Sequence, residues 1–151
     1  MKNTKITLAH GSGGKLTHEL VQRLFLPNFN NDVLSILGDS AILNINGAKL
    51  AFTTDSYVVK PLFFPGGDIG RLAVSGTIND LAVVGAEPMF LSAGFIIEEG
   101  FEMSLLEKIV SSMRETTGLT GVDIVTGDTK VVESGSADGL YINTCGIGIV
   151  N

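Results

Sequence analysis

Residues 66–85 read GGDIGRLAVSGTINDLAVVG, and this stretch predicts the helix around which the rest of the chain is arranged. Asp68 stands where a helix N-cap is expected, because its carboxylate can accept hydrogen bonds from the free amides of a first turn. Gly85 suits the left-handed residue that follows the end of a helix. The apolar residues between them therefore predict a core helix over residues 69–84.

A small polar stripe interrupts this apolar helix. At about 100° per residue, Ser75, Gly76, Asn79 and Asp80 share one face. A buried and unpaired carboxylate is costly, so Asp80 needs solvent, a partner or a cation. A solvent-exposed helix face is the alternative interpretation.

The segments on either side of this helix have strand and helix patterns. Asn46-Gly47 is typical of a tight hairpin turn and predicts two antiparallel strands around it. Ser104-Leu-Leu-Glu107 matches a capping box and predicts a second core helix that ends at the glycines of residues 118–121. The predicted strands are residues 41–45, 49–54, 89–97, 122–126 and 140–150.

The N-terminal segment differs from the rest of the chain in its glycine content. Residues 1–14 are too rich in glycine for a helix or strand and are expected to be flexible, whereas Lys15 to Leu26 has helical spacing that Pro27 should end. We therefore expect a flexible segment over residues 1–14 and a single domain over residues 15–151.

This order of elements predicts an α/β (α+β) fold, a mixed sheet of about four strands with helices on one face. Strands as apolar as residues 89–97 cannot leave the other face open to water, and a second copy of the chain is the simplest cover. We expect a homodimer.

Composition narrows the class of protein further. Apolar residues make up 44% of the chain and charged residues 17%, as in globular proteins. The net charge of −6, with no basic cluster, disfavours nucleic acid as a partner. Cys145 is the single cysteine and is expected to be a small buried hydrophobic residue. No segment is apolar enough for membrane insertion, and a cytoplasmic location is expected.

Aspartates recur near the predicted ends of strands and helices, where sheet proteins present groups to ligands. Mg²⁺ prefers oxygen ligands, and Asp39, Asp55 and Asp80 offer the right chemistry. For Asp39, Asp55 and Asp128 the alternative is that such aspartates only cap turns through local amides.

A glycine-rich loop, His10-Gly-Ser-Gly-Gly-Lys15, has amides that could surround a phosphate while Lys15 supplies a positive charge. It is not a Walker A loop, since Ala9 and Leu16 occupy positions that this motif reserves for glycine and for serine or threonine. A mobile terminus is the alternative.

Taken together, these segments resemble the HypE-like hydrogenase maturation factors, which belong to the ATP-binding superfamily of aminoimidazole ribonucleotide synthetase. The resemblance runs from residue 8 to about residue 150. The matching strings are Leu8-Ala-His-Gly-Ser-Gly-Gly-Lys15, Thr54-Asp-Ser-Tyr-Val-Val59, Pro61-Leu-Phe-Phe-Pro-Gly-Gly-Asp-Ile-Gly70, Gly76-Thr-Ile-Asn-Asp-Leu-Ala-Val83, Gly94-Phe-Ile-Ile-Glu-Glu-Gly100 and Val125-Thr-Gly-Asp-Thr-Lys-Val-Val132.

The resemblance implies the N-terminal domain of that fold, with two copies pairing their sheets into a closed barrel and ATP bound near the interface. It implies Mg²⁺ held by Asp39, Asp55 and Asp80, although Gly38 stands where relatives often have a further acid. The residues implied around the nucleotide are Gly11, Ser12, Gly13, Gly14, Lys15, Thr54, Asn79, Gly127, Asp128 and Thr129.

The resemblance also implies a reaction. HypE-like enzymes use ATP to dehydrate a carboxamide, carried on the sulfur of their own C-terminal cysteine, to a thiocyanate for the cyanide ligands of NiFe hydrogenase. Phosphorylation makes the amide oxygen a good leaving group, and a cation offsets the developing charge. Lys130 is the preferred candidate for that cation and Lys15 the other, with a structural salt bridge as the alternative for Lys130.

The resemblance further implies carbamoyl-transferring and iron–cyanide scaffold maturation proteins as partners. The 151 residues contain neither the second domain nor the terminal acceptor cysteine of such enzymes, so we expect the chain alone not to turn over. Two other functions stay open: a dimerisation and docking module without nucleotide turnover, and a small-molecule kinase of the same superfamily.

Overall fold

The structure is a computed structural model that describes residues 5–151, and the chain divides after Gly38 into two compact units. The first unit is helical. Its elements are a 3-10 turn at Leu8–His10, α1 at Lys15–Leu20, a π-helical turn at Val21–Phe25, α2 at Leu26–Phe29 and a second 3-10 turn at Leu34–Ile36.

One expectation about this segment was wrong. Pro27 does not end the helix, which continues to Phe29, because the proline lies in the first turn of α2, where its missing amide proton is not needed. By its internal contacts the chain divides after residue 38, so residues 15–38 group with the N-terminal segment, and the expected division at residue 14 stays a prediction.

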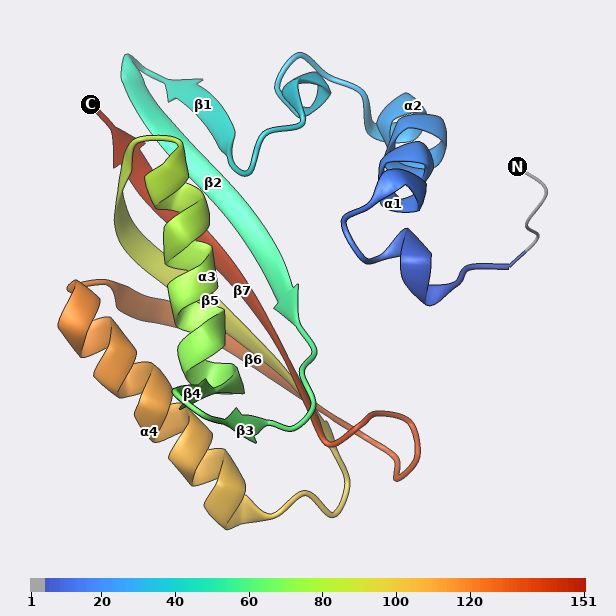
Figure 1. The fold of residues 1–151 in the computed structure, drawn as a ribbon. Helices are drawn as coiled ribbons and strands as arrows, with labels where there is room; N and C mark the ends of the chain where they lie inside the picture. Colours follow the sequence, from blue (N-terminus) through green and yellow to red (C-terminus); the bar gives the residue numbers. More distant parts are fainter. Residues whose placement is uncertain (1–4) are drawn as a thin grey trace. The chain divides into compact units, whose positions relative to one another are not determined.

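The second unit is built on a five-stranded mixed sheet in the order β1-β2-β7-β5-β6 (Figure 1). The mixed α/β class is confirmed, with five strands rather than four. Only β5 and β6 are parallel, because a helix connects them, and every other neighbouring pair is antiparallel. The elements are β1 Ala41–Ile45, β2 Ala48–Tyr57, β3 Phe63–Phe64, β4 Gly67–Asp68, α3 Ile69–Val83, β5 Ala86–Glu98, α4 Met103–Thr120, β6 Asp123–Val132 and β7 Leu140–Val150.

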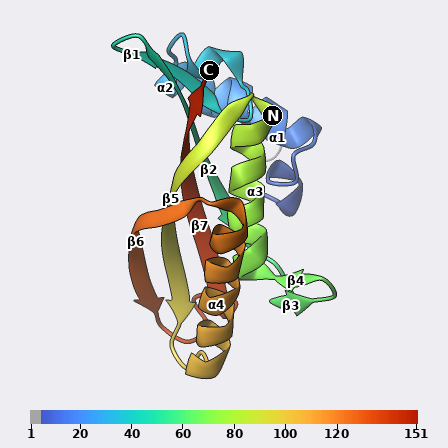
Figure 2. The same ribbon diagram turned by 90° about the vertical axis from the view of Figure 1, so that its left-hand side faces the viewer.

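Both long helices lie on one face of this sheet, as expected (Figure 2). α3 packs on β2, β7 and β5, and α4 packs on α3. The core between helices and sheet contains Ile69, Val74, Leu91, Ile109, Leu140 and Ile142. The opposite face, called the open face below, exposes large apolar side chains, since Phe52, Phe90, Ile96 and Ile147 are between 40% and 44% exposed.

The turn and cap signals of the central segment are confirmed. Asp68 Oδ1 accepts hydrogen bonds from the amides of Gly70 at 2.7 Å and Arg71 at 3.1 Å. Gly85 follows α3 with a φ of 76°, and the hairpin residues Asn46 and Gly47 have φ values of 51° and 89°. These residues adopt the conformations that their chemistry favours.

Strand lengths differ from the prediction in a way that matters for function. β2 extends to Tyr57 and β6 to Val132, so Asp55 and Asp128 lie within strands and not after them. Both strands continue because they stay paired over these residues, β2 with β7 and β6 with β5. β5 likewise continues through Pro88, where a register shift breaks the regular ladder.

The expected capping box of the second helix was wrong. α4 begins two residues earlier than the capping box implies, at Met103, and its N-cap, Glu102, makes no side-chain cap bond. The helix continues past Gly118 to Thr120, and the left-handed Gly121 ends it. No helix in residues 5–151 is long and apolar enough to cross a membrane.

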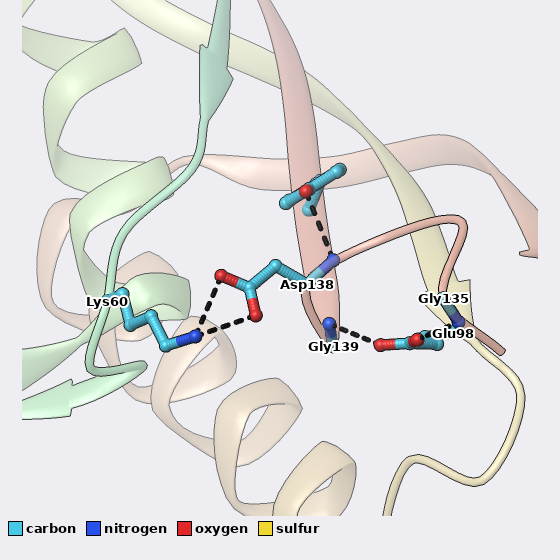
Figure 3. Close-up of polar contacts among 6 residues, drawn as sticks. Lys60, Glu98, Gly135, Asp138 and Gly139 are labelled. Atoms are coloured by element: carbon cyan, nitrogen blue, oxygen red, sulfur yellow. Dashed lines mark hydrogen bonds and ion pairs between the residues drawn. The ribbon is translucent and has the colours of Figure 1, made fainter.

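The loop between β6 and β7, residues 133–139, is tied down at both ends (Figure 3). The Glu98 carboxylate accepts a hydrogen bond from the Gly135 amide at 2.5 Å and another from the Gly139 amide at 2.9 Å. Lys60 Nζ also donates to both carboxylate oxygens of Asp138, at 2.8 and 3.0 Å. The ion pair is exposed and stabilises little, so Glu98 is the stronger restraint.

The contact between α3 and α4 provides a test of the packing. A side chain at Gly70 would place Cβ 2.6 Å from the Ile109 carbonyl oxygen and 2.8 Å from Met113. We expect Gly70→Ala to lower the free energy of unfolding by about 1–3 kcal/mol, as overpacked cores do. Urea unfolding followed by circular dichroism measures it.

Gly118→Ala is the matched control, because a Cβ there meets nothing within 4 Å and the residue is helical. It should raise the free energy of unfolding by about 1 kcal/mol. Equal effects of the two substitutions would contradict the proposed tight helix contact.

Candidate functional site

The three predicted metal-binding aspartates lie in the same region of the second unit. Asp39 precedes β1, Asp55 lies in β2 on the side facing the helices, and Asp80 lies near the end of α3. Thr53 joins two of them, because its Oγ1 is 2.9 Å from the Asp39 carbonyl oxygen and 3.3 Å from Asp80 Oδ2. Ser40 Oγ donates to the Asp80 carbonyl oxygen at 2.7 Å. The end of α3 is therefore fastened to the start of the hairpin.

The charges of these carboxylates act on one another. The pKa of Asp80 is raised above its ordinary value of 3.8 by burial first, then by the negative charge of Asp55 and, more weakly, of Asp39, while the Thr53 hydrogen bond opposes the rise. Such a concentration of negative charge attracts a cation, and carboxylate oxygens are the donors that Mg²⁺ prefers.

The donor chemistry therefore fits Mg²⁺. Across residues 5–151, however, no three acidic, histidine or cysteine side chains stand close enough together to hold a metal ion as they are placed. The assignment of Asp39, Asp55 and Asp80 as ligands stays a prediction.

Tyr57 is a buried neighbour of this cluster that the sequence analysis missed. Its hydroxyl is 3.2 Å from Thr77 Oγ1, which is in turn hydrogen bonded to Thr144 Oγ1 in the core. Burial, with a smaller contribution from Asp55, raises the pKa of Tyr57 to about 12, so the phenol stays protonated at neutral pH. The alternation of Thr53, Asp55 and Tyr57 along one strand was the signal that could have revealed it.

The predicted residues of β6 divide between the two faces of the sheet. Asp128 and Lys130 lie on the open face, where with Ser56, Tyr141 and Asn143 they line a cavity of about 400 Å³. Gly127 and Thr129 pair with the helix-facing Ala93 and Phe95 and line a groove of about 850 Å³ between α4 and β6.

This division separates Asp128 and Lys130 from the aspartate cluster. β7 and β5 stand between β2 and β6, so about 14 Å of sheet separates the two strands. Asp55 also faces the helices whereas Asp128 faces away from them. Within one chain, the structure does not bring Asp128 and Lys130 to Asp39, Asp55 and Asp80.

Three other residues that were predicted to bind the nucleotide differ in their contacts and exposure. Gly127 leaves no room for a side chain, because a Cβ would collide with the Ala93 carbonyl oxygen. Asn79 is exposed on α3 beside Asp80. Thr54 lies on the open face, where its Oγ1 is 3.2 Å from the Thr144 carbonyl oxygen.

Cys145 is not a core residue as expected. It is partly exposed on the open face, and its Sγ donates to Thr54 Oγ1 at 3.2 Å. The strand alternation explains the difference, because the neighbouring residues Thr144 and Gly146 take the buried positions of β7.

The glycine-rich loop belongs to the first unit and is held by its own helix. The Gly13 amide donates to Thr17 Oγ1 at 3.0 Å, and Ser12 Oγ donates to the Ala9 carbonyl oxygen at 3.2 Å. Lys15 is the first residue of α1. Its Nζ lies 4.0 Å from Glu19 Oε1, and its side chain is 88% exposed. The charge of Lys15 is thus accessible to a ligand.

The fold and the acidic cluster define the class of protein. The chain matches the family described as AIR synthase related protein, N-terminal domain, over residues 37–150, and it belongs to that family. It is also 53% identical, over 96% of its length, to the carbamoyl dehydratase HypE of Escherichia coli (strain K12). The expected resemblance to HypE is confirmed.

Two solved structures agree with this result. A HypE–HypF complex matches with a TM-score of 0.81 and 54% identity, over 87% of this chain and 42% of that chain. A HypE in complex with ATP matches with a TM-score of 0.68 and 52% identity, over 97% of this chain and 44% of that chain. The present chain spans only 45% of the length of the Escherichia coli protein.

The raised pKa of Asp80 predicts a pH-dependent stability. Ionised Asp80 opposes folding, and this cost is present above the raised pKa and disappears as the pH falls below 3.8. We expect Asp80→Asn to raise the urea midpoint at pH 7 and to lose that advantage as the pH approaches 3.8. Unfolding curves measured across this range give the difference.

Asp123→Asn, an exposed change of the same kind on β6, should leave the midpoint nearly constant at each pH. An Asp80→Asn variant that is less stable than the wild type at pH 7 would argue against repulsion within the cluster.

Proposed function

We propose that this chain binds Mg-ATP as the N-terminal half of an ATP-dependent carbamoyl dehydratase that serves hydrogenase maturation. The observation that carries the proposal is the cluster of Asp39, Asp55 and Asp80 at the end of α3, in which burial and the negative charges of Asp55 and Asp39 raise the pKa of Asp80. A related HypE has been solved with ATP, which supports nucleotide as the ligand.

In this proposal Asp39, Asp55 and Asp80 hold Mg²⁺, which when bound neutralises the charge of the phosphates. The glycine-rich loop supplies amides to the phosphates, and Lys15 supplies a positive charge. The other residues proposed at the nucleotide are Thr54, Asn79, Gly127, Asp128 and Thr129.

The proposed chemistry is transfer of phosphate to a carboxamide oxygen, followed by its loss as the nitrile of a thiocyanate forms. Lys130 is the preferred group to offset the charge that develops on the transferred phosphate, and because it lies apart from Asp39, Asp55 and Asp80 within one chain, this role requires a second copy of the chain. Because the Escherichia coli relative is more than twice as long as this chain, turnover is assigned to a protein that also has the second half and its acceptor cysteine.

The proposed setting is the cytoplasm, with other maturation proteins as partners. A related HypE has been solved in complex with HypF, which supports another maturation protein as one partner, and we propose that such a partner transfers the carbamoyl group. An iron–cyanide scaffold protein is proposed as the recipient of the product.

The open face is the proposed homodimer surface. Phe52, Phe90 and Ile147 form an apolar group on three neighbouring strands, and each is about 40% exposed in the single chain. A second copy that pairs its sheet with this one would bury them and could close a barrel.

One observation favours a second candidate, in which the chain only dimerises and docks. As placed, no three potential ligands among residues 5–151 gather around a common metal position. On this view the nucleotide site is incomplete without the second half of the protein.

Calorimetry with ATP at millimolar Mg²⁺ tests the proposal. The wild-type chain should bind, and Asp55→Asn or Asp80→Asn should weaken binding by about tenfold or more because a metal ligand loses its charge. Lys130→Ala should reduce turnover of the two-half protein and change nucleotide affinity less.

Glu115→Gln on the exposed side of α4 removes one negative charge away from the cluster and should bind as the wild type does. A folded wild-type dimer without affinity for Mg-ATP would instead support the docking module. Binding that is equal in wild type and Asp80→Asn would remove Asp80 from the metal site.

Sedimentation equilibrium tests the dimer. Phe52→Asp should shift the chain toward monomer, because it places a charge in the centre of the proposed interface. Leu119→Asp, at an 81% exposed position near the end of α4, is the matched control and should stay dimeric. A Phe52→Asp dimer as strong as that of the wild type would place the interface elsewhere.

A further inference from the structure

His10 stands directly before the glycines of the glycine-rich loop, at the end of the 3-10 turn Leu8–His10. It is the only buried residue between residues 5 and 38, with 5% of its surface exposed. Thr7 holds its ring, because the Thr7 amide donates to His10 Nδ1 at 3.1 Å and Thr7 Oγ1 is 2.9 Å from the same nitrogen. The imidazole is therefore fixed in one orientation beside the loop.

The Thr7 amide decides which ring nitrogen carries the proton. An amide N–H can only donate, so Nδ1 must accept, and in a neutral imidazole the proton then lies on Nε2. A proton on Nδ1 would meet the amide proton, and the Thr7 carbonyl oxygen, 3.3 Å from Nδ1, already accepts the His10 amide at 3.0 Å. The neutral ring is thus held as the Nε2–H tautomer.

The protonated nitrogen is the part of the ring that reaches the surface. The hydrogen bonds of the His10 side chain to residues 5–151 all involve Nδ1, which leaves Nε2 without a partner in that range. Over the same residues, no buried side-chain nitrogen or oxygen lacks a partner, so Nε2 is not buried with the rest of the ring. His10 therefore presents one N–H donor to solvent.

This tautomer excludes two common roles of histidine. Nε2 has no free lone pair, so it can neither bind a metal ion nor accept a proton while the Thr7 bond is kept. A histidine that binds a metal ordinarily donates its other N–H to an oxygen, whereas the other nitrogen of His10 accepts from Thr7. A fixed donor of this kind suits an anion.

The surroundings of His10 indicate which anion. Ser12 Oγ donates to the Ala9 carbonyl oxygen at 3.2 Å, which folds the glycine-rich loop back on the turn that carries His10. The exposed charge of Lys15 lies at the end of the same loop. A positive charge beside a glycine-rich backbone is typical of a site for phosphate.

We propose that His10 Nε2–H is a hydrogen-bond donor through which the glycine-rich loop recognises a phosphate oxygen of the nucleotide, and that Thr7 fixes its tautomer. The inference rests on the proposed Mg-ATP function and adds a binding residue to it. It needs only residues of the first unit. Because the ring is oriented and its proton is placed before the ligand arrives, binding has less to reorganise.

Nitrogen-15 NMR of the two imidazole rings tests the tautomer. In alkaline buffer without ligand, where imidazole is neutral, His10 should carry its proton on Nε2. His18, exposed on α1, is the internal reference and should show the mixed tautomers of a solvated ring. A His10 proton on Nδ1, or a mixture like that of His18, would overturn the inference. Mg-ATP should then shift the Nε2 resonance of His10 and leave His18 unchanged.

Two substitutions separate the donor from the cap. His10→Gln places an amide N–H near the position of Nε2, whereas His10→Asn places an amide oxygen near that of Nδ1 and loses the donor. In calorimetry with ATP at millimolar Mg²⁺, His10→Asn should bind about tenfold more weakly or worse, because a hydrogen bond to a charged group is lost. His10→Gln should recover most of the affinity. A residue that only caps the turn predicts the reverse order.

His18→Asn is the matched control and should bind as the wild type does. Inorganic triphosphate, which lacks the nucleoside, should give the same order of variants as ATP if the donor recognises phosphate. Mg-ATP binding by wild type with equal affinity in His10→Asn, or with the reverse order of the two His10 variants, would overturn this inference alone. A wild type that binds neither ATP nor triphosphate would overturn the proposed function and this inference with it.

Discussion

The close packing of α3 against its neighbours is the constraint on which the second unit depends. The helix touches α4 through Gly70, β2 through Gly76 and β7 through Gly146, and in each case a methyl group would meet atoms already in place. Interiors packed this tightly move as a unit, since no gap absorbs a shift. Asp80 lies on this helix, so the packing of the core holds Asp80 in its place within the acidic cluster.

Local chemistry in the sequence predicted the central elements well. Asp68 and Gly85 bound α3, and Asn46-Gly47 makes the hairpin, because each of these signals acts within a few residues. The exposed apolar side chains of the open face were also predictable, because the strands are apolar on both faces and the two helices cover only one of them. The family resemblance followed from strings such as residues 76–83, which combine a helix signal with the acidic stripe.

Features that depend on contacts distant in sequence were not predictable. The extents of β2 and β6 are set by pairing with β7 and β5, so Asp55 and Asp128 were placed at strand ends when they lie inside strands. Thr77 and Thr144 are 67 residues apart, and no sequence pattern indicated that their hydroxyls would meet. The π-helical turn before Pro27 was also missed, because proline ordinarily signals a helix end.

Glu98 has a consequence for how the chain can be altered. Its carboxylate joins the two ends of the β6–β7 loop, so cutting between Gly135 and Gly139 would leave both cut ends fastened to the end of β5. Both halves of the cut loop would stay hydrogen bonded to Glu98. A chain cleaved in this loop should therefore keep β6 and β7 in their positions. New chain termini could be placed there, provided that Glu98 is kept.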